Sequence, residues 1–458
     1  MKKQHLLFLL GLIILAFSCK PEEEIFSFDT NLKLEFSKDT ILFDTVFTSI
    51  GSVTKRLIVK NPNRNALRIS DINLAGRNNS PYSIIVNGFE GENFKEEKLL
   101  GGDSLLILVK VLIDPNSDDL PFFVKDSIVF NTNGNIQDVK LIAYGQNANF
   151  LNDSILACNT VWDSERPYVI SNSILVDTLC SLTIEKGTKV FSENGSFIFI
   201  KGSLVVNGEA QDQVLFRNSR LDEDFEEAPG QWGGIIFLPG SKNNKINFAE
   251  IKNAQVGLNL DTFDSDTIPE LVIENTIIKN MSTSGILTIG ADLIARNTLV
   301  HDCAEFTIGN FGGGNYTYHN CTFASFRFKF FRQDPSIVVT DIFQRRDESV
   351  LTDNLRFEMV NCIGWGDLEN ELAFDNSGNA QFELIFANNL LRTQIQELDI
   401  NENILNADPK FIDAASDFHL DTLSPAKDKG IPLLNILKDL DNNDRDDTPD
   451  IGAYERIE

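Results

Sequence analysis

The sequence has few of the residues that build metal sites and nucleophilic sites. It contains 4 histidines and 6 cysteines in 458 residues, and no two cysteines have the CxxC spacing. His301, His319 and His419 are isolated in the sequence, which argues against a zinc site. There is also no GxSxG motif, and no glycine-rich phosphate loop that follows a strand and opens a helix. These absences argue against an α/β-hydrolase nucleophile and a nucleotide site.

Positive charge is scarce as well. The chain has 40 Lys and Arg residues against 67 Asp and Glu residues, which gives a formal net charge of −27 at pH 7. Nucleic acids and anionic membranes are themselves negatively charged, so this balance argues against both as partners. We interpret the charge as a solvated acidic surface. The chain is 42% hydrophobic, which is ample for folding, and its length predicts two or three domains.

Long apolar runs are missing except at the start. Residues 6–17 form an apolar stretch that is too short to span a bilayer, and Lys2 and Lys3 precede it. This pattern predicts a signal peptide over residues 1–18. Because no later run is long enough to cross a membrane, any anchoring would be by lipid alone. A cleaved, soluble secretory protein is the alternative.

A recurring triplet is the strongest positive signal. It lies inside short, β-prone runs, and its copies are Asn275-Thr276-Ile277, Asn297-Thr298-Leu299, Asn320-Cys321-Thr322, Asp341-Ile342-Phe343, Asn361-Cys362-Ile363 and a looser copy at Asn388. The first five copies start 20 to 23 residues apart. This period predicts a solenoid in which each turn is one coil of a parallel β-helix. We expect the amides to stack at one corner and to hydrogen-bond along the axis.

Short runs of β-forming residues, interrupted by glycines, precede the triplets. They lie at residues 182–190, 197–208 and 231–237. Together with the triplets they resemble right-handed parallel β-helix proteins of the pectate-lyase-like superfamily, over more than half of the chain. The resemblance implies a right-handed parallel β-helix over residues 149–400. It says little about activity, because the superfamily holds lyases, hydrolases, adhesins and inert scaffolds.

The signal peptide ends in a second recognisable motif. Ala16-Phe17-Ser18-Cys19 resembles a bacterial lipobox, and the following lysine-plus-acidic tract resembles that of Bacteroidota surface lipoproteins. The resemblance implies that Cys19 is lipidated and that residues 19–27 are an acidic tether. It implies attachment to outer-membrane lipid, with the protein facing the cell exterior.

Two further segments flank the predicted β-helix. Residues 28–148 contain several short strands with alternating polarity, which predicts an antiparallel sandwich. They resemble the immunoglobulin-like modules that act as spacers in Bacteroidota surface proteins. Residues 401–458 resemble the C-terminal closure of bacterial β-helix proteins, which a solenoid needs to cover its last coil. The predicted fold class is therefore all-β: an Ig-like β-sandwich followed by a right-handed parallel β-helix with a C-terminal cap.

The cysteines suggest one disulfide. With Cys19 acylated, five cysteines remain, so at least one is unpaired. Cys158 and Cys180 are 22 residues apart, about one coil, and could bridge the start of the solenoid. Cys303, Cys321 and Cys362 are expected to be small buried residues of the stack.

Two clusters are candidates for ligand binding. Arg327, Lys329, Arg332, Arg345 and Arg346 form a cationic cluster that could hold an acidic sugar. Charge balance against nearby carboxylates is the alternative. Asp439, Asp441 and Asn443 alternate like the first ligands of a calcium loop, although the expected glycine and the bidentate glutamate are missing. Ca²⁺ is therefore the only cofactor that the sequence suggests.

The two clusters leave two functions open. The first is a non-catalytic surface scaffold that binds glycan or mediates cell-surface contact along the β-helix. The second is a polysaccharide lyase or glycoside hydrolase that acts on an acidic glycan. A purely structural envelope protein is a third possibility. No catalytic residue can be assigned, because the chain has too many acidic residues to choose a pair and matches no catalytic grouping of the lyase families.

Overall fold

The structure, a computed structural model, describes residues 25–116, 121–262, 268–326 and 331–457. The chain divides into two compact units, Met1–Asn147 and Ala148–Glu458, one residue from the boundary expected between sandwich and β-helix. The described residues form strands and three short 3-10 turns, η1 (Arg77–Asn79), η2 (Glu223–Phe225) and η3 (Gln396–Leu398). Among them no helix is long and apolar enough to span a membrane.

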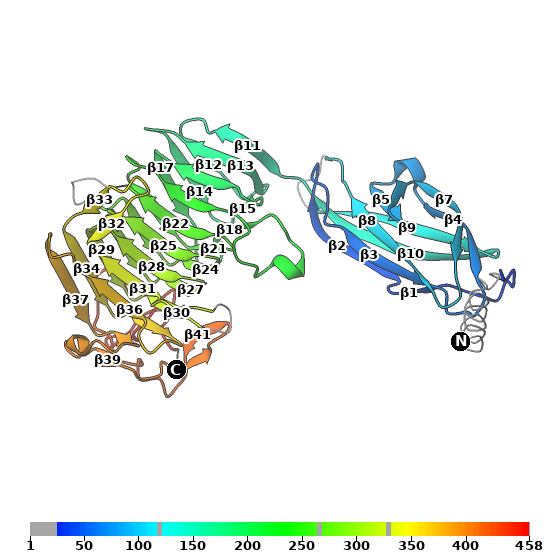
Figure 1. Cartoon of the computed structure of the whole chain (residues 1–458). Helices are drawn as coiled ribbons and strands as arrows, with labels where there is room; N and C mark the ends of the chain where they lie inside the picture. Colours follow the sequence, from blue (N-terminus) through cyan, green and yellow to red (C-terminus); the bar gives the residue numbers. More distant parts are fainter. Residues whose placement is uncertain (1–24, 117–120, 263–267, 327–330, 458) are drawn as a thin grey trace, which may run out of the picture. The chain divides into compact units, whose positions relative to one another are not determined.

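The first unit is a sandwich of two five-stranded sheets (Figure 1). One sheet has the strand order β1 (Glu35–Phe36), β3 (Lys55–Lys60), β8 (Ser104–Val111), β5 (Tyr82–Val86) and β6 (Phe89–Gly91). The other has the order β2 (Thr40–Phe47), β10 (Asn135–Gln146), β9 (Phe122–Thr132), β4 (Leu67–Leu74) and β7 (Asn93–Leu99). Alternation along β8 sends Leu105, Ile107 and Val109 into the core. The strands pair antiparallel, as predicted, except that β2 pairs parallel with β10.

The second unit is a parallel β-helix, as predicted, and its strands form three faces (Figure 1). Face A contains β15 (Lys189–Ser192), β18 (Val214–Asn218), β21 (Ala249–Lys252), β24 (Ile277–Met281), β27 (Leu299–Cys303), β30 (Thr322–Ser325), β35 (Ile363–Gly366), β38 (Leu390–Leu391) and β39 (Ile404–Leu405). Face B contains β16 (Phe197–Ile200), β19 (Gly234–Phe237), β22 (Val256–Asp261), β25 (Ser284–Ile289), β28 (Phe306–Phe311), β31 (Ile337–Thr340) and β36 (Leu372–Asp375). Face C contains β12 (Thr160–Trp162), β14 (Ser181–Glu185), β17 (Ser203–Asn207), β20 (Asn244–Asn247), β23 (Leu271–Glu274), β26 (Leu293–Arg296), β29 (Gly314–His319), β34 (Leu355–Val360) and β37 (Phe382–Ala387).

The remaining strands start the β-helix or lie outside its faces. β11 (Asn149–Ile155) and β13 (Tyr168–Val176) form the first rungs, and β13 pairs with strands of both face A and face B. Two antiparallel hairpins lie outside the three faces. In the first, β32 (Ile342–Gln344) pairs with β33 (Val350–Thr352), and in the second, β40 (Phe411–Asp413) pairs with β41 (Asp417–Leu420). One apolar core runs through the interior of the coils and includes Trp232, Tyr316 and Phe357, each 0% exposed.

The recurring asparagines turn the corner between face C and face A. Asn275, Asn297, Asn320, Asn361 and Asn388 all have a positive φ, between 45° and 55°. Asparagine tolerates this left-handed conformation better than most residues do, which explains why the sequence repeats it. The predicted ladder forms in part: the Asn297 amide donates to Asn275 Oδ1 over 3.0 Å, and Asn361 donates to Asn320 Oδ1 over 3.4 Å.

The Asp341 copy of the triplet is not a rung of this ladder, so that part of the prediction was wrong. Asn320 and Asn361 lie on neighbouring coils although they are 41 residues apart. Asp341 follows β31 on face B, where the hairpin β32–β33 is inserted. The near-regular spacing was a coincidence, because one enlarged coil has twice the length of its neighbours.

The C-terminal segment does more than cover the last coil, which was the role predicted for it. The aromatic and aliphatic side chains of Phe418, Leu440 and Ile451 pack against Leu299 and Ile363 on the outer surface of face A. The backbone of the segment also contacts the asparagine corner, since Asn361 donates to Ile431 O over 2.7 Å and Asn297 to Lys438 O over 2.7 Å. Residues 407–457 therefore run back over the side of the β-helix.

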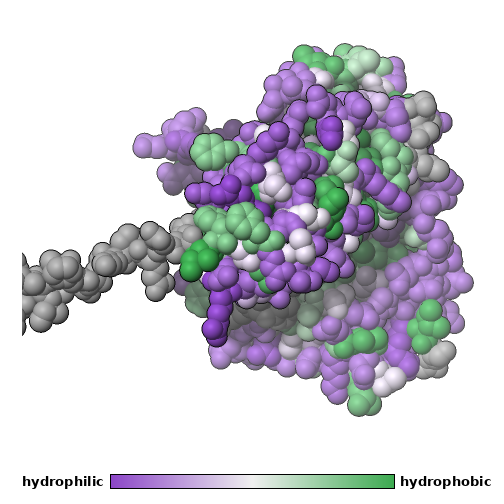
Figure 2. Space-filling model, turned by 90° about the vertical axis from the view of Figure 1, so that its right-hand side faces the viewer, coloured by the Kyte–Doolittle hydropathy of each residue, from purple (hydrophilic) through white to green (hydrophobic). Residues whose placement is uncertain are grey.

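The surface is in keeping with the acidic composition. On the face shown in Figure 2, hydrophilic residues predominate and hydrophobic residues form small scattered groups. Scattered apolar residues are normal on a soluble surface and carry no functional meaning by themselves.

Candidate functional site

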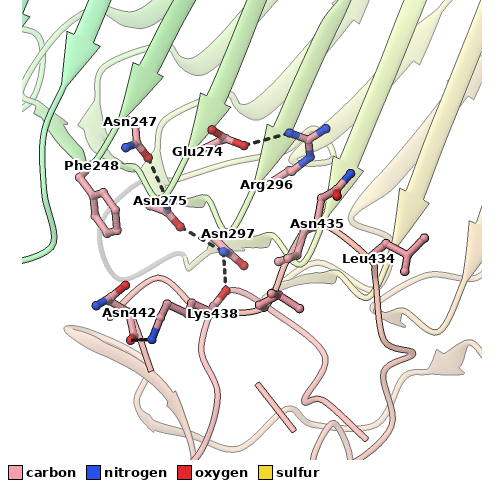
Figure 3. A pocket seen from close by; sticks show the side chains of 12 residues that line it. Asn247, Phe248, Glu274, Asn275, Arg296, Asn297, Leu434, Asn435, Lys438 and Asn442 are labelled. Atoms are coloured by element: carbon pink, nitrogen blue, oxygen red, sulfur yellow. Dashed lines mark hydrogen bonds and ion pairs between the residues drawn. The ribbon is translucent and has the colours of Figure 1, made fainter. Parts of the chain in front are cut away.

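The asparagine corner and the C-terminal segment enclose a cavity of about 470 Å³, which we call the amide pocket. Its β-helix wall consists of Asn247, Phe248, Glu274, Asn275, Arg296 and Asn297. The opposite wall consists of Leu434, Asn435, Ile436, Leu437, Lys438 and Asn442 (Figure 3). These two sets come from distant parts of the sequence, and the bond between Asn297 and Lys438 O joins residues that are 141 positions apart.

The pocket offers hydrogen-bond donors and acceptors in fixed positions. On the β-helix wall, Asn275 donates to Asn247 Oδ1 over 2.9 Å and Asn297 donates to Asn275 Oδ1 over 3.0 Å (Figure 3). Each amide thereby has a set orientation. Asn435 and Asn442 face these amides from the other side, and Phe248 and Leu434 add apolar surface. Planar polar groups beside apolar ones suit a ligand that has both hydroxyl groups and C–H faces.

An ion-pair network fixes the charged part of this wall. Glu274 lies between Lys245 at 3.0 Å and Arg296 at 2.9 Å. Burial acts to raise the pKa of Glu274, but hydrogen bonds from Lys245 and Arg296 outweigh it and hold the pKa below its usual value. The carboxylate therefore stays ionised at neutral pH, and part of the Glu274 and Arg296 side chains is exposed.

A second cavity, of about 520 Å³, lies over face A, and we call it the histidine pocket. It is lined by Ile277, Lys279, Leu299, His301 and Asp302 of the β-helix, by Glu227 of the loop after β18, and by Ala415, Ser416, Asp417, Phe418, His419 and Tyr454 of the C-terminal segment. His301 Nδ1 contacts Asp302 Oδ2 at 2.9 Å. Two of the three histidines that looked isolated in the sequence, His301 and His419, are thus brought to one cavity.

His419 is held as a cation. Its Nε2 contacts Asp441 at 2.9 Å, its Nδ1 contacts Asp417 at 2.6 Å, and its ring stacks on Tyr454 with centroids 3.9 Å apart. The hydrogen bond to Asp441, followed by that to Asp417, raises the pKa of His419 from 6.5 to about 9 against the effect of burial. At neutral pH this imidazolium is not a proton acceptor, so it does not act as a general base.

The other charges of the histidine pocket are paired in the same way. Lys279 contacts Glu250 at 3.0 Å, and Glu227 contacts Lys252 at 2.8 Å. Burial acts to lower the pKa of Lys279, but the charges of Glu250 and Glu227 raise it above its usual value. Burial acts to raise the pKa of Glu227, but the hydrogen bond from Lys252, the charges of Lys279 and Lys252 and the hydrogen bond from Asn280 together lower it below its usual value. Both groups stay charged over a wide pH range.

The residues of the predicted cationic cluster that the structure describes, Arg332, Arg345 and Arg346, differ in their surroundings. Arg327 and Lys329 lie outside the described residues. Arg345 and Arg346 are exposed on the hairpin β32–β33 insertion, where Arg345 reaches Asp261 at 3.6 Å. Whether these two residues bind a ligand stays a prediction.

Arg332 requires a correction, because it is buried and structural. Its side chain is 1% exposed, and its guanidinium donates to both oxygens of Glu371, at 2.7 and 2.9 Å. It also donates to Ser325 O at 3.2 Å and to Asp334 O at 2.9 Å. A charge buried in such a network cannot reach a sugar at the surface.

The calcium prediction is not supported either. Asp439 is fully buried and accepts hydrogen bonds from the backbone N–H groups of Asn443 and Glu455. Asp441 instead pairs with His419, and the Asn443 amide donates to Asp439. Over the described ranges no group of three or more His, Cys, Asp or Glu side chains is placed to hold a metal ion. These oxygens stabilise the fold of the C-terminal segment.

The cysteines behave as the spacing predicted. Cys158 and Cys180 form a disulfide at the start of the β-helix, and Cys303, Cys321 and Cys362 are free and buried. Cys19 lies outside the described residues, so its lipidation stays a prediction. Burial, the largest effect, raises the pKa of the Cys303 thiol far above its usual value, which makes the thiol unreactive.

The sequence comparisons agree with this geometry. Residues 154–289 match a family model described as a pectate-lyase like beta helix domain. The second unit contains a pectate-lyase-like β-helix domain. The match ends at β25, so the coils that follow and the C-terminal segment lie beyond it. A comparison with curated proteins found no match.

Solved structures give only distant likenesses to this β-helix protein. A family 123 glycoside hydrolase from Clostridium perfringens is 9% identical, with a TM-score of 0.19, and the likeness covers 27% of this chain and 30% of the hydrolase. The catalytic unit of a GH87 alpha-1,3-glucanase from Streptomyces thermodiastaticus strain HF3-3 is 12% identical, with a TM-score of 0.28, covering 73% and 83%. A protein of unknown function from Porphyromonas gingivalis W83 is 13% identical, with a TM-score of 0.18, covering 27% and 59%. The likeness thus spans less than a third of the first of these proteins.

Proposed function

We propose that this protein is a non-catalytic glycan-binding scaffold and that a sugar unit of the glycan occupies the amide pocket. The observation that carries the proposal is the wall of oriented amides, Asn247 and Asn275 held in place by Asn297, opposite Asn435 and beside the Glu274–Arg296 ion pair. Sugar hydroxyls both donate and accept hydrogen bonds, and amides supply both functions in one planar group.

The size and the apolar part of the pocket support the same ligand. Its volume of about 470 Å³ lies in the range of roughly 300–1,000 Å³ that is usual for small-molecule sites. Phe248 and Leu434 provide apolar surface against which the C–H face of a sugar ring can pack. Both the hydroxyl groups and the ring face of a sugar would then have partners.

We further propose that the chain is anchored to the outer membrane through acylated Cys19 and faces the cell exterior. The support is the sequence of residues 1–24, in which a short apolar stretch ends at a cysteine and an acidic tether follows. Residues 28–148 would then act as an Ig-like spacer between anchor and β-helix.

A lyase or glycoside hydrolase that acts on an acidic glycan is the second candidate. It is favoured by the histidine pocket, where Glu227, Asp302 and Asp417 lie close to Lys279 and His301. Acid–base catalysis needs a group that can change its protonation near neutral pH. The ion pairs of Glu227, Lys279 and His419 work against this, and so the binding function is preferred.

One experiment separates the two functions. The purified chain from Ile25 to Glu458 is incubated with plant, algal and host polysaccharides, with and without Ca²⁺, and both binding and new chain ends are recorded. We expect retention of at least one polysaccharide without cleavage. New chain ends on any polymer would contradict the scaffold and support the enzyme.

A matched pair of variants places the binding site. Arg296→Gln combined with Asn435→Ala should weaken binding about tenfold or more, because two polar partners are lost. Arg356→Gln is the control, since Arg356 makes similar ion pairs with Glu358 and Glu383 on face C but does not line the amide pocket. Equal loss of binding in both variants would mean that the glycan binds elsewhere.

A further inference from the structure

The histidine pocket has carboxylates on three of the elements that enclose it. Glu227 comes from the loop between β18 and β19, Asp302 from β27 and Asp417 from the hairpin β40–β41. The side chains of Glu227 and Asp417 are 46% and 40% exposed, so both have oxygen atoms that a ligand can reach. Glu227 accepts hydrogen bonds from Lys252 and Asn280, and Asp417 Oδ1 contacts the ring and the backbone N–H of His419. A carboxylate has about four lone-pair positions, so each of the two keeps positions for a ligand.

Aromatic rings form the other walls of the pocket. The rings of His301 and Phe418 lie with centroids 4.6 Å apart, and those of His419 and Tyr454 lie 3.9 Å apart. The faces of Phe and Tyr rings attract cations through the ring quadrupole, so Phe418 and Tyr454 supply this attraction and the protonated His419 ring does not. Aromatic walls and carboxylates together are therefore suited to a positively charged group of moderate size.

The electrostatic balance of the pocket is negative. Three carboxylates line it against the two cations Lys279 and His419. These cations contact the further carboxylates Glu250 and Asp441, and Lys252 contacts Glu227, so the carboxylates still outnumber the cations. The pKa of Tyr454 is affected by the same negative charges. Burial raises this pKa, and the charges of Asp441 and Asp417 raise it further. A ligand cation would reduce the excess negative charge of the pocket, whereas a ligand anion would increase it.

We propose that the histidine pocket binds the protonated amine of an amino-sugar unit, so that the glycan recognised by this protein carries free amino groups. This inference rests on the proposed glycan-binding function and adds a second contact to it. The ammonium group lies between Glu227 and Asp417 and contacts the ring walls, while uncharged sugar units are held elsewhere. N-acetylation of the amine removes its charge and two of its hydrogen-bond donors, so it abolishes this contact.

The test uses two soluble probes that differ only in this group, glucosamine tetrasaccharide and its fully N-acetylated form. Binding to the purified protein is measured by calorimetry at pH 6, where the amine and the carboxylates are charged. We expect the free-amine probe to bind at least about tenfold more tightly, the gain of a charge-assisted contact. Equal affinity for the two probes, or tighter binding of the N-acetylated form, would overturn the proposal.

Two variants assign the effect to this pocket. Glu227→Gln should reduce the preference for the free amine about tenfold, and Glu223→Gln on the same loop is the matched control because it does not line the pocket. Asp417→Asn removes a second carboxylate of the pocket, on another element, and tests the same contact if Glu227→Gln disturbs the loop. If neither pocket variant changes the preference, the amine is bound elsewhere and the inference is wrong.

The outcome for this inference is separable from that for the proposed function. Failure of the amine preference, together with polysaccharide binding that depends on Arg296 and Asn435, leaves the glycan-binding function standing and rejects only the amine contact. Loss of all polysaccharide binding would reject the proposed function itself.

Discussion

His419 shows how two neighbours can set the charge of one residue. In an unfolded chain its pKa would be near 6.5, whereas in the structure Asp441 and Asp417 raise it to about 9. The protonated ring also stacks on Tyr454 and so helps to hold the hairpin β40–β41 against the rest of the C-terminal segment. Its ion pairs are partly exposed, which limits their contribution.

This charge predicts a pH dependence of stability. A group whose pKa is raised on folding stabilises the protein fully below its unfolded pKa, and this stabilisation is lost as the pH rises through the folded pKa. His419 should therefore stabilise the structure below about pH 6.5 and lose its contribution as the pH rises through about 9. Urea unfolding at pH 6, 8 and 10 checks this.

The comparison protein for that measurement is His419→Gln, which cannot be protonated. The difference in the free energy of unfolding between the native protein and this variant should be larger at pH 6 than at pH 10. A difference that does not change with pH would show that the ring packs in place without help from its charge.

At the scale of the element, the corner asparagines were the most predictable feature. An asparagine at a fixed period indicates a bend that needs a left-handed backbone, and this requirement is local to the residue. The amide bonds between coils were predicted in kind but form only at some corners, at Asn297 with Asn275 and at Asn361 with Asn320. The Asp341 copy was wrong because an insertion can imitate the period, and only the strand pairing between β29 and β34 reveals it.

Asn297 allows the two roles of a corner asparagine to be separated. Asn297→Gly keeps the left-handed backbone, φ 45°, but loses the hydrogen bonds to Asn275 Oδ1 and Lys438 O and the one accepted from Arg445. We expect it to reduce the free energy of unfolding by about 2 kcal/mol. Asn297→Ala loses the same bonds and adds strain of about 1 kcal/mol.

Urea unfolding of both variants measures this difference. Asn315→Ala is a control on the same β-helix: its asparagine bonds Asp292 but has no positive φ, so strain should not enter. If Asn297→Gly and Asn297→Ala were equally stable, the backbone requirement would not explain why asparagine recurs at the corner.

At the scale of the whole molecule, the C-terminal segment covers one side of the β-helix. Face A carries outward apolar residues such as Leu299, Ile363 and Leu390, and the segment buries them in a second hydrophobic cluster. Arg445 connects the segment to the corner, because it donates to Asn297 Oδ1 at 3.1 Å and pairs with Glu455 at 3.0 Å. The same segment supplies one wall of each candidate pocket.

Removal of the segment should therefore expose an apolar surface. A chain that ends at residue 406 is expected to unfold at lower urea concentration and to self-associate, because several large side chains of face A lose their cover. Size-exclusion chromatography and urea unfolding would measure both effects. A stable, monomeric truncated protein would show that face A does not need this cover, and that the segment serves the pockets alone.

The sequence by itself determined the all-β architecture, the division near residue 148, the disulfide and the asparagine corner, because each depends on period, composition or spacing along the chain. Only the tertiary structure decided where the side chains converge. In the folded chain, Arg332 is buried against Glu371, and Asp439 and Asp441 bind other residues of the protein. His301 and His419 line one cavity. The reason is physical: a cavity forms between segments that are more than 100 residues apart, and which surfaces meet depends on how the apolar side of face A is covered.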